Sequence, residues 1–307
     1  MVEKAGGRLD QLELEAKGPD NEDLGIDIGW FGPENPERVV LHSSGLHGVE
    51  GFAGSAIQLQ LLDDLPTMPG DCSLVLVHIL NPYGMSWLRR VNENNVDLNR
   101  NFMADDVYSG APKLYGRLDS FLNPQSVPRN DFYLLRAAWL ILRYGLPALT
   151  QTVAGGQYEY PRGLFFGGKR LQEGLQKYRA FLATRLANAK QIIAIDVHSG
   201  LGKYAEDSLF TEATGASYII RGGLESMLRT VLPQAKIHFT TQEFGTYSPT
   251  TVLSALREEN RWHHYGDGAV DHPAKQHLKR TFAPEDDSWR ISVLNRGREA
   301  LKRATRL

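Results

Sequence analysis

Cysteine is almost absent from this chain of 307 residues, since Cys72 is the only one in the sequence. A single cysteine cannot form an intrachain disulfide, and it cannot build a thiolate metal cluster. Any metal that the chain binds must therefore be held by histidine, aspartate or glutamate side chains.

The chain also lacks an excess of charge of either sign. It has 34 Lys and Arg against 36 Asp and Glu, a formal net charge of −2 at pH 7. No global basic field is available to attract nucleic acid or an anionic membrane, so neither is expected as a partner. Hydrophobic residues make up 42% and charged residues 23% of the chain, which is ordinary globular usage. Disordered, fibrous and coiled-coil classes are thereby excluded.

Long hydrophobic runs are missing as well. The best apolar stretch, 137–149, is interrupted by Arg143 and Pro147, so no bilayer-spanning segment is expected. The opening residues carry an early acid and no apolar core, and they are not expected to be a secretory signal. They suggest either the end of a helix closed by Gly6 and Gly7 or a frayed turn. The default expectation is a cytoplasmic protein.

β-Branched runs alternate with helical periodicities along the chain. The predicted strands are 25–31, 38–44, 73–80, 191–198 and 236–245. The predicted helices are 51–65, 132–144, 170–190, 222–232, 250–264 and 287–304. This alternation predicts a single α/β domain over residues 1–307, with a mixed, mostly parallel central sheet flanked by helices.

The stretch 103–168 breaks this alternation. It is rich in proline, glycine and aromatic residues, and no strand is predicted within it. We interpret it as an insertion that covers one rim of the sheet and the cleft, because long loops of this kind often build or gate a site. The alternative is a surface excursion without a role in the site.

A histidine and a glutamate follow the second predicted strand at helical spacing. His47 and Glu50 are three positions apart, which places both side chains on one face of a helical turn. Two ligands alone do not make a metal site. His198 ends an apolar run, at the carboxyl end of a predicted strand, where ligand groups collect in open α/β sheets. Together the three form a His₂Glu set, which suits zinc with one position open for water.

Other polar segments have less specific meanings. Asp196 shares a strand face with His198, where it either orients that ligand or is a satisfied strand-end acid. The run RRVNENNVDLNRNF (89–102) is dense in side-chain donors, and its guanidinium groups suit a carboxylate or an oxyanion. Glu243, at the end of the last predicted strand, is either a base in a cleft or a strand-edge acid.

The order of these segments resembles that of the zinc carboxypeptidase superfamily. HxxE is followed by Asn-Pro-x-Gly, by RVNENNVDLNRNF, by a strand ending in His and by a strand ending in Glu. The resemblance covers about 38–247, fades in 103–168, and is nearest to a little-characterised branch that carries only a domain-of-unknown-function label. It implies a three-layer α/β/α fold and a metallopeptidase-type hydrolase with one zinc ion per chain.

The resemblance also implies roles for individual residues. His47, Glu50 and His198 would bind zinc, with water in the fourth place. Glu243 would be the general base that takes a proton from this water. Arg90 would polarise the scissile carbonyl and stabilise the oxyanion.

Further roles concern the substrate and the support of the ligands. Asn99 and Arg100 would hold a carboxylate of the substrate, and Asp97 would hold the imidazole of a zinc ligand from behind. The tyrosine that closes over the substrate in the digestive enzymes of the superfamily has no clear counterpart here. Tyr218 and Tyr247 are the candidates.

The resulting hypothesis is a zinc-dependent hydrolase that cleaves an amide bond next to a free carboxylate, most simply a metallocarboxypeptidase acting on peptides. The alternative is a deacylase of N-acyl amino acids, of the succinylglutamate desuccinylase and aspartoacylase type. A non-catalytic zinc-binding relative is less favoured, because the ligands and Glu243 are all present. A serine hydrolase would need a G-x-S-x-G motif, which the sequence lacks. The oligomeric state and the substrate side chain stay open.

Overall fold

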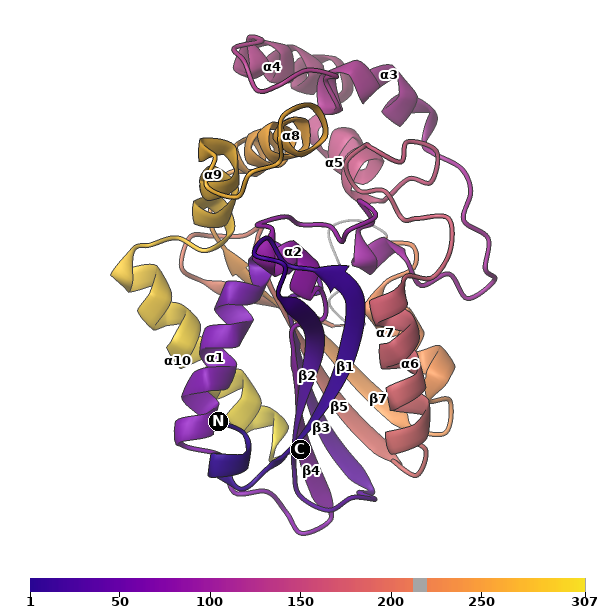
Figure 1. Cartoon of the computed structure of the whole chain (residues 1–307), viewed down its shortest axis with the longest axis vertical. Coiled ribbons are helices and arrows are strands. Elements are labelled where there is room, and N and C mark those ends of the chain that lie inside the picture. The colour runs from indigo at the N-terminus through magenta and orange to yellow at the C-terminus, as the bar shows by residue number, and fades with distance from the viewer. Residues whose placement is uncertain (212–219, 307) are drawn as a thin grey trace.

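A seven-stranded sheet in the order β1-β2-β4-β3-β5-β7-β6 forms the centre of the computed structural model, which describes residues 1–211 and 220–306 (Figure 1). The strands are β1 Arg8–Lys17, β2 Asp23–Phe31, β3 Arg38–Ser44, β4 Cys72–His78, β5 Gln191–Gly200, β6 Asp207–Thr211 and β7 Lys236–Gly245. The pairs β4–β3, β3–β5 and β5–β7 are parallel, whereas β1, β2 and β6 pair antiparallel at the edges. The predicted fold class, a mixed sheet that is parallel in its centre and flanked by helices, is confirmed.

Helices cover both faces of this sheet and one of its ends (Figure 1). The helices are α1 Gly51–Asp63, α2 Pro82–Ser86, α3 Lys113–Leu122, α4 Tyr133–Tyr144, α5 Leu146–Ala154, α6 Glu173–Arg185, α7 Leu224–Val231, α8 Pro249–Tyr265, α9 Pro273–Phe282 and α10 Asp287–Ala304. Short 3₁₀ turns are η1 Glu3–Ala5, η2 Gly48–Glu50 and η3 Leu98–Arg100. One hydrophobic core joins the sheet to α6 and α7, and a second joins its other face to α1 and α10.

The central strands are apolar on both sides because both of their faces are covered. On β5, Ile192 and Ala194 belong to the core under α6 and α7, whereas Ile193, Ile195 and Val197 belong to the core under α1 and α10. This is the two-residue alternation of a strand, applied to a run in which every position is buried. Such continuous β-branched runs are the strands that the sequence predicts.

Several elements without a continuous apolar run were not predicted from the sequence. β1 alternates charged residues with leucine and stays partly exposed at the edge of the sheet, so no apolar run marks it. The helices α2, α5 and α9 carry proline in their first turn, where its missing N–H costs nothing. Helix α3 was also missed, inside 103–168.

The helices α3, α4 and α5 pack against α8 around a third hydrophobic core. Long side chains of α8 reach into the loops between them. Arg257 donates through Nε to the carbonyl of Phe121 at 2.6 Å and through its Nη2 to Asp131 at 2.8 Å. Arg261 donates to the carbonyls of Ser126 and Val127. Directional bonds to α8 therefore hold this end of the molecule together.

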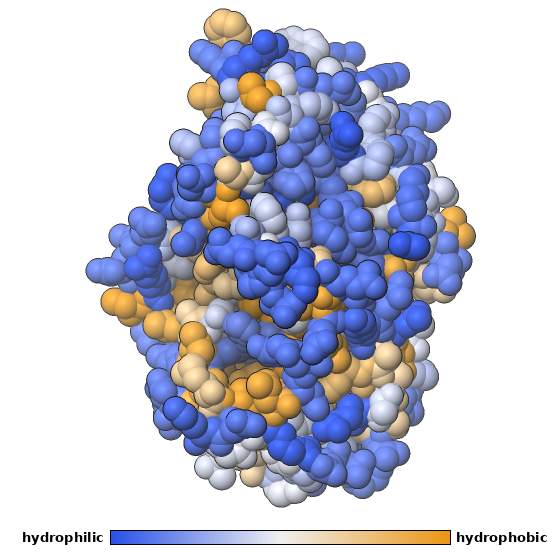
Figure 2. All heavy atoms as spheres, viewed as in Figure 1, coloured by the Kyte–Doolittle hydropathy of each residue, from blue (hydrophilic) through white to orange (hydrophobic). Residues whose placement is uncertain are grey.

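The surface seen in Figure 2 is largely hydrophilic, with hydrophobic side chains in small groups, as is normal for a globular protein. An exception is helix α4, which exposes four large hydrophobic side chains on its outer side: Leu134, Leu135, Trp139 and Leu142. Among the residues described, no helix is both long and apolar enough to cross a membrane.

Candidate metal centre

The carboxyl ends of β3, β5 and β7 meet at one edge of the sheet, and the candidate site lies there. After β3 the chain turns at Gly45, where φ is 65°, and His47 caps the following turn η2. His198 on β5 lies in register with Glu243 on β7. Parallel pairing thus brings residues from three distant segments to one place.

The loop that carries His47 and Glu50 is held by main-chain contacts. The N–H groups of Gly48 and Val49 donate to the carbonyls of Arg90 and Arg89 at 3.1 and 2.8 Å. A Cβ on Gly48 would lie 2.2 Å from the carbonyl carbon of Gly84 in α2. Glycine is therefore required at position 48, and the approach of the two backbones fixes the loop.

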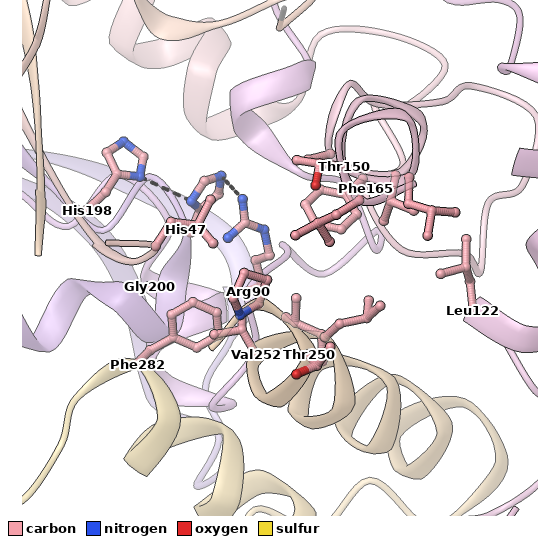
Figure 3. A pocket seen from close by; sticks show the side chains of 18 of the residues that line it. His47, Arg90, Leu122, Thr150, Phe165, His198, Gly200, Thr250, Val252 and Phe282 are labelled. Carbon is pink, nitrogen blue, oxygen red and sulfur yellow. Dashed lines mark hydrogen bonds between the residues drawn. The ribbon is translucent and has the colours of Figure 1, made fainter. Parts of the chain in front are cut away.

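Three buried side chains converge at this loop. The Nδ1 atom of His47 lies 3.0 Å from Glu50 Oε1, and the Nδ1 atom of His198 lies 3.1 Å from Glu50 Oε2. The two Nδ1 atoms are 3.2 Å apart (Figure 3). His47, Glu50 and His198 form the group in the described chain whose ligand atoms could hold a metal ion.

An acid lies behind each of the two imidazoles. The Nε2 atom of His47 is 3.1 Å from Asp97 Oδ1, and the Nε2 atom of His198 is 2.7 Å from Asp196 Oδ2. For His198, the acid at Nε2 favours a proton on that nitrogen, which leaves Nδ1 as the atom that faces Glu50. Asp97 and Asp196 are both buried.

The donor set fits zinc. In a tetrahedral site with Zn–N bonds of about 2.0 Å, neighbouring ligand atoms are about 3.3 Å apart. The two Nδ1 atoms are 3.2 Å apart, and each lies 3.0–3.1 Å from one of the two carboxylate oxygens of Glu50, which is close to this ligand–ligand distance. Two imidazole nitrogens and one carboxylate are the ligands of an open catalytic zinc site rather than of a closed structural one.

The charges around the ligands favour a cation. Burial alone would raise the pKa of Glu50, but the charges of His47 and Arg90 outweigh it and hold this pKa well below its usual range. Burial lowers the pKa of His198, but Asp196 and Glu50 outweigh it and raise this pKa well above its usual value. The site therefore attracts positive charge between its ligands, and a metal ion would replace a proton there.

Glu243 faces the same space from the neighbouring strand. Its Oε1 atom accepts the N–H of Leu201 at 2.9 Å. Burial and the negative charge of Glu50 raise the pKa of Glu243 to about 7. The residue before Leu201 is Gly200, where φ is 144°. A Cβ at this position would lie 3.4 Å from the carboxylate of Glu243. Among the described residues, this backbone N–H is the hydrogen-bond donor that holds the carboxylate.

Arg90 reaches the ligands directly. Its Nη1 contacts Glu50, its Nη2 lies 2.8 Å from His47 Nε2 (Figure 3), and its Nε donates to Asp97 at 3.2 Å. The neighbouring Arg89 points the other way and is fully buried against Glu259 on α8. The two consecutive arginines therefore have different surroundings.

Asn99 and Arg100 are placed differently from each other. Asn99 borders the cavity described below, and its Oδ1 accepts the N–H of Leu224. Arg100 is fully buried and donates through Nε and Nη2 to the carbonyl of Ala154 at 2.9 and 2.6 Å. It is not among the described residues that border the cavity. A carboxylate-binding role for this pair stays a prediction.

Of the two tyrosine candidates, the structure describes only Tyr247. Tyr218 lies outside the described residues. Tyr247 is exposed and its ring packs against that of Tyr204 with centroids 5.9 Å apart.

A cavity of about 430 Å³ opens from the ligands toward α3, α4, α5 and α8. At one end it is bordered by His47, Glu50, Arg90, His198 and Glu243. Its remaining wall is mainly apolar, as follows: Leu118, Phe121 and Leu122 of α3; Tyr133, Ala137, Leu140 and Ile141 of α4; Leu146, Leu149, Thr150, Val153 and Ala154 of α5; Pro249, Thr250, Val252, Leu253 and Leu256 of α8; and Asn99, Phe165, Ser199, Gly200, Leu201, Gly202, Phe210, Ile220, Thr241 and Phe282. Figure 3 has Leu122 on the opposite side of the cavity from His198.

Sequence reasoning missed this wall. Most of its residues come from 118–165 and 249–282, with others at 199–202, 210, 220 and 241, and no motif marks the helical part. The available signal was the proline- and aromatic-rich composition of 103–168. It suggested that this segment covers the cleft, but it did not indicate which side of each helix faces the cavity.

Comparison with known families places the chain. A family model matches residues 2–216 and 208–296. The chain belongs to the family described as Protein of unknown function (DUF2817). No curated protein matches the DUF2817 chain.

Several solved structures are similar to this DUF2817 protein. Murein-tripeptide amidase MpaA from Escherichia coli O157 is 16% identical, with 83% of this chain and 92% of that chain covered and a TM-score of 0.41. Carboxypeptidase A from Helicoverpa armigera is 13% identical, with 93% and 72% covered and a TM-score of 0.40. A succinylglutamate desuccinylase from Silicibacter sp. TM1040 is 12% identical, with 85% and 67% covered and a TM-score of 0.40. Structures of carboxypeptidase and desuccinylase type are thus among those similar to the chain.

Proposed function

We propose that this protein is a zinc-dependent hydrolase that cleaves an amide bond next to a free carboxylate, with one zinc ion per chain. The observation that carries the proposal is the convergence of His47 Nδ1, His198 Nδ1 and Glu50 within 3.0–3.2 Å of one another, beside the carboxylate of Glu243. A His₂Glu set with an adjacent unligated glutamate has the parts of a metal-assisted hydrolytic site.

His47, Glu50 and His198 would hold the ion. When bound there, zinc supplies Lewis acidity, which polarises a carbonyl and makes water a stronger nucleophile at neutral pH. Asp97 and Asp196 fix the two imidazole rings so that Nδ1 faces the ion.

Glu243 is the general base in this proposal. Its carboxylate borders the cavity and comes from the position in register with His198, which is where a group that takes and returns a proton is needed. The carboxylate of Glu243 accepts a proton from the attacking water. It then gives this proton to the nitrogen of the leaving amine, so that the products are an acid and an amine.

Arg90 stabilises negative charge on the carbonyl oxygen. Its side chain is 11% exposed and borders the cavity, so part of the guanidinium group can reach a bound substrate. Its contacts with Glu50, Asp97 and His47 fix its position before substrate arrives, which is the condition for electrostatic stabilisation of a transition state.

The free carboxylate beside the bond is suggested by the sequence resemblance, with Asn99 and Arg100 as its holders. A carboxypeptidase and a deacylase of N-acyl amino acids both act next to such a carboxylate. The catalytic groups are the same for the two reactions, so the metal site alone does not choose between peptides and N-acyl amino acids as substrates.

The test combines zinc content with turnover. We expect Glu243→Gln to bind about one zinc per chain and to lose turnover of N-acyl amino acids and peptides, because only the base is removed. We expect His198→Ala to lose the zinc. The matched controls are Glu258→Gln on α8, which is partly exposed, and His238→Ala on β7, which is exposed.

Zinc is measured by mass spectrometry on protein purified without a chelator or an affinity metal. A fully active Glu243→Gln variant would remove Glu243 as the base. Unchanged zinc content in His198→Ala would refute the metal site.

A further inference from the structure

The cavity beside the metal centre is charged at one end only. His47, Glu50, Arg90, His198 and Glu243 all lie at the ligand end. Beyond them, the described residues of the wall bear no ionisable group apart from the phenol of Tyr133. A carboxylate or an ammonium group placed there would lose its hydration without gaining a counter-charge, which is strongly unfavourable.

The far part of the cavity also offers few hydrogen-bond partners. The hydroxyl of Tyr133 already donates to the carbonyl of Thr250 at 2.7 Å. The side chains of Thr150 and Thr250 are the other polar groups that the described wall presents between α4, α5 and α8. A peptide segment in this space would leave its N–H and C=O groups without partners, at a cost for each of them. An apolar chain has no such groups to satisfy.

The volume is large for a single side chain. At about 430 Å³ the cavity lies within the range of about 300–1,000 Å³ that is typical of pockets for whole small ligands. Its wall is built from α3, α4, α5 and α8, so it extends from the sheet edge into the helices of 113–154. Figure 3 shows this extension, with the histidines on one side, Leu122 on the other, and Thr150 and Thr250 across from each other between them.

We infer that the cavity holds a long aliphatic acyl chain, so that the substrate is an N-acyl amino acid with a fatty acyl group. This inference rests on the proposed function and selects deacylation over peptide cleavage. The acyl carbonyl lies at the ligand end, its chain extends toward Leu122, and the amino acid with its carboxylate stays at the polar end near Asn99. The oxygen of water bonds to the acyl carbon, the C–N bond breaks, and the amine nitrogen takes the proton from Glu243.

Chain length is the first test. Hydrolysis of N-acetyl-, N-hexanoyl- and N-decanoyl-L-alanine is compared with that of a dipeptide blocked at its N-terminus by an acetyl group. We expect kcat/KM to rise about fourfold for each added methylene until the cavity is filled, which is the factor that burial of one CH₂ provides. Equal rates for acetyl and decanoyl substrates, or a preference for the peptide, would refute the acyl-chain inference while leaving the hydrolase proposal intact.

Two adjacent alanines of α4 provide a matched pair of variants. Ala137 is buried and borders the cavity, whereas Ala138 is exposed on the outer side of the helix. We expect Ala137→Trp to lower kcat/KM for the decanoyl substrate at least about tenfold, the loss of about two methylene contacts, and to spare the acetyl substrate. Ala138→Trp should change neither. An equal effect of the two variants would contradict the inference.

A binding measurement separates the two proposals. Decanoic acid is titrated calorimetrically into zinc-loaded Glu243→Gln protein, alone and with Ala137→Trp or Ala138→Trp added. We expect binding that Ala137→Trp weakens and Ala138→Trp does not. If no substrate is hydrolysed but decanoate still binds in this pattern, the hydrolase proposal fails and the acyl-chain cavity stands. If decanoate does not bind to the zinc-loaded protein, the cavity assignment fails.

Discussion

Asp196 offers a direct test of how the metal ligands are held. It is buried at the end of β5, its Oδ2 lies 2.7 Å from His198 Nε2, and its Oδ1 accepts the hydroxyl of Ser43 at 2.7 Å. We compare Asp196→Asn, which keeps an oxygen acceptor but removes the charge, with Asp196→Ala, which removes both. Ser43→Ala is the matched control, because it removes the other hydrogen bond of Asp196 and leaves its contact with His198.

The expected loss follows from these contacts. Removing the carboxylate behind a metal-bound histidine typically costs 10–100-fold in metal affinity. Because Asp196→Asn can still accept the proton of Nε2, we place it near tenfold, about 1.4 kcal/mol. Asp196→Ala frees the ring and leaves Nε2 without a partner, so we place it near 100-fold, about 3 kcal/mol. Ser43→Ala should stay within about threefold of the parent protein.

Zinc affinity is measured at pH 7 by competition with a chromophoric chelator, and circular dichroism shows whether each variant is folded. The order parent, Ser43→Ala, Asp196→Asn, Asp196→Ala is the expected order of decreasing affinity. Folded Asp196→Asn and Asp196→Ala proteins with the affinity of the parent would reduce Asp196 to a strand-end acid. A loss in Ser43→Ala as large as in Asp196→Ala would show a general disturbance of β3 and β5.

Three more predictions concern the stability of the fold and the affinity for zinc. Burial raises the pKa of Glu259, but the charges of Arg89 and Lys275 outweigh burial and lower this pKa to about 2. The ionised Glu259 carboxylate therefore stabilises the fold fully above the pKa of the unfolded chain, near 4.5, and this contribution is lost as the pH falls from 4.5 toward 2. Glu259→Gln should lower the free energy of unfolding by about 3–5 kcal/mol at pH 7 and should reduce the loss of stability between pH 7 and pH 3.5. Urea unfolding at the two pH values measures both effects, and an unchanged pH dependence would contradict the prediction. Gly48→Ala should lower zinc affinity because its Cβ meets α2 at 2.2 Å, and zinc titration with Gly70→Ala, at an open position, as the control checks it. Removal of zinc by a chelator should lower the melting temperature of the parent but not of His198→Ala, and an equal fall in both would argue against zinc at this site.

The parallel core of the sheet could be predicted because β3, β4 and β5 are buried on both faces and therefore consist of continuous apolar runs. The edge strand β1 could not, because its exposed side alternates charges with leucine and leaves no such run. Helix boundaries were predicted well where a charged first turn marks the start, as at Asp287 of α10. Helix α5 was not predicted, although α8, which also begins with proline, was.

The candidate site also has a part that could be predicted from sequence and a part that could not. His47, Glu50 and His198 could be proposed from sequence because a metal restricts residue types and their spacing. The wall of the cavity could not, since an apolar residue such as Leu122 or Leu140 looks the same in a sequence whether it fills a core or borders a space. Which side of α4 faces inward depends on packing against α8, and that contact joins residues far apart in the chain.

The two consecutive arginines also connect the candidate metal centre to the apolar cavity. The carbonyls of Arg89 and Arg90 hold the loop of His47 and Glu50, while the side chain of Arg89 is anchored on Glu259 of α8, the helix whose earlier turns border the cavity. The main chain and side chain of Arg89 thus connect the loop that would hold an ion with the helix that would contact a ligand in the cavity. Coupling between two binding sites is reciprocal, so any factor by which zinc changes the affinity for a ligand in the cavity is also the factor by which that ligand changes the affinity for zinc.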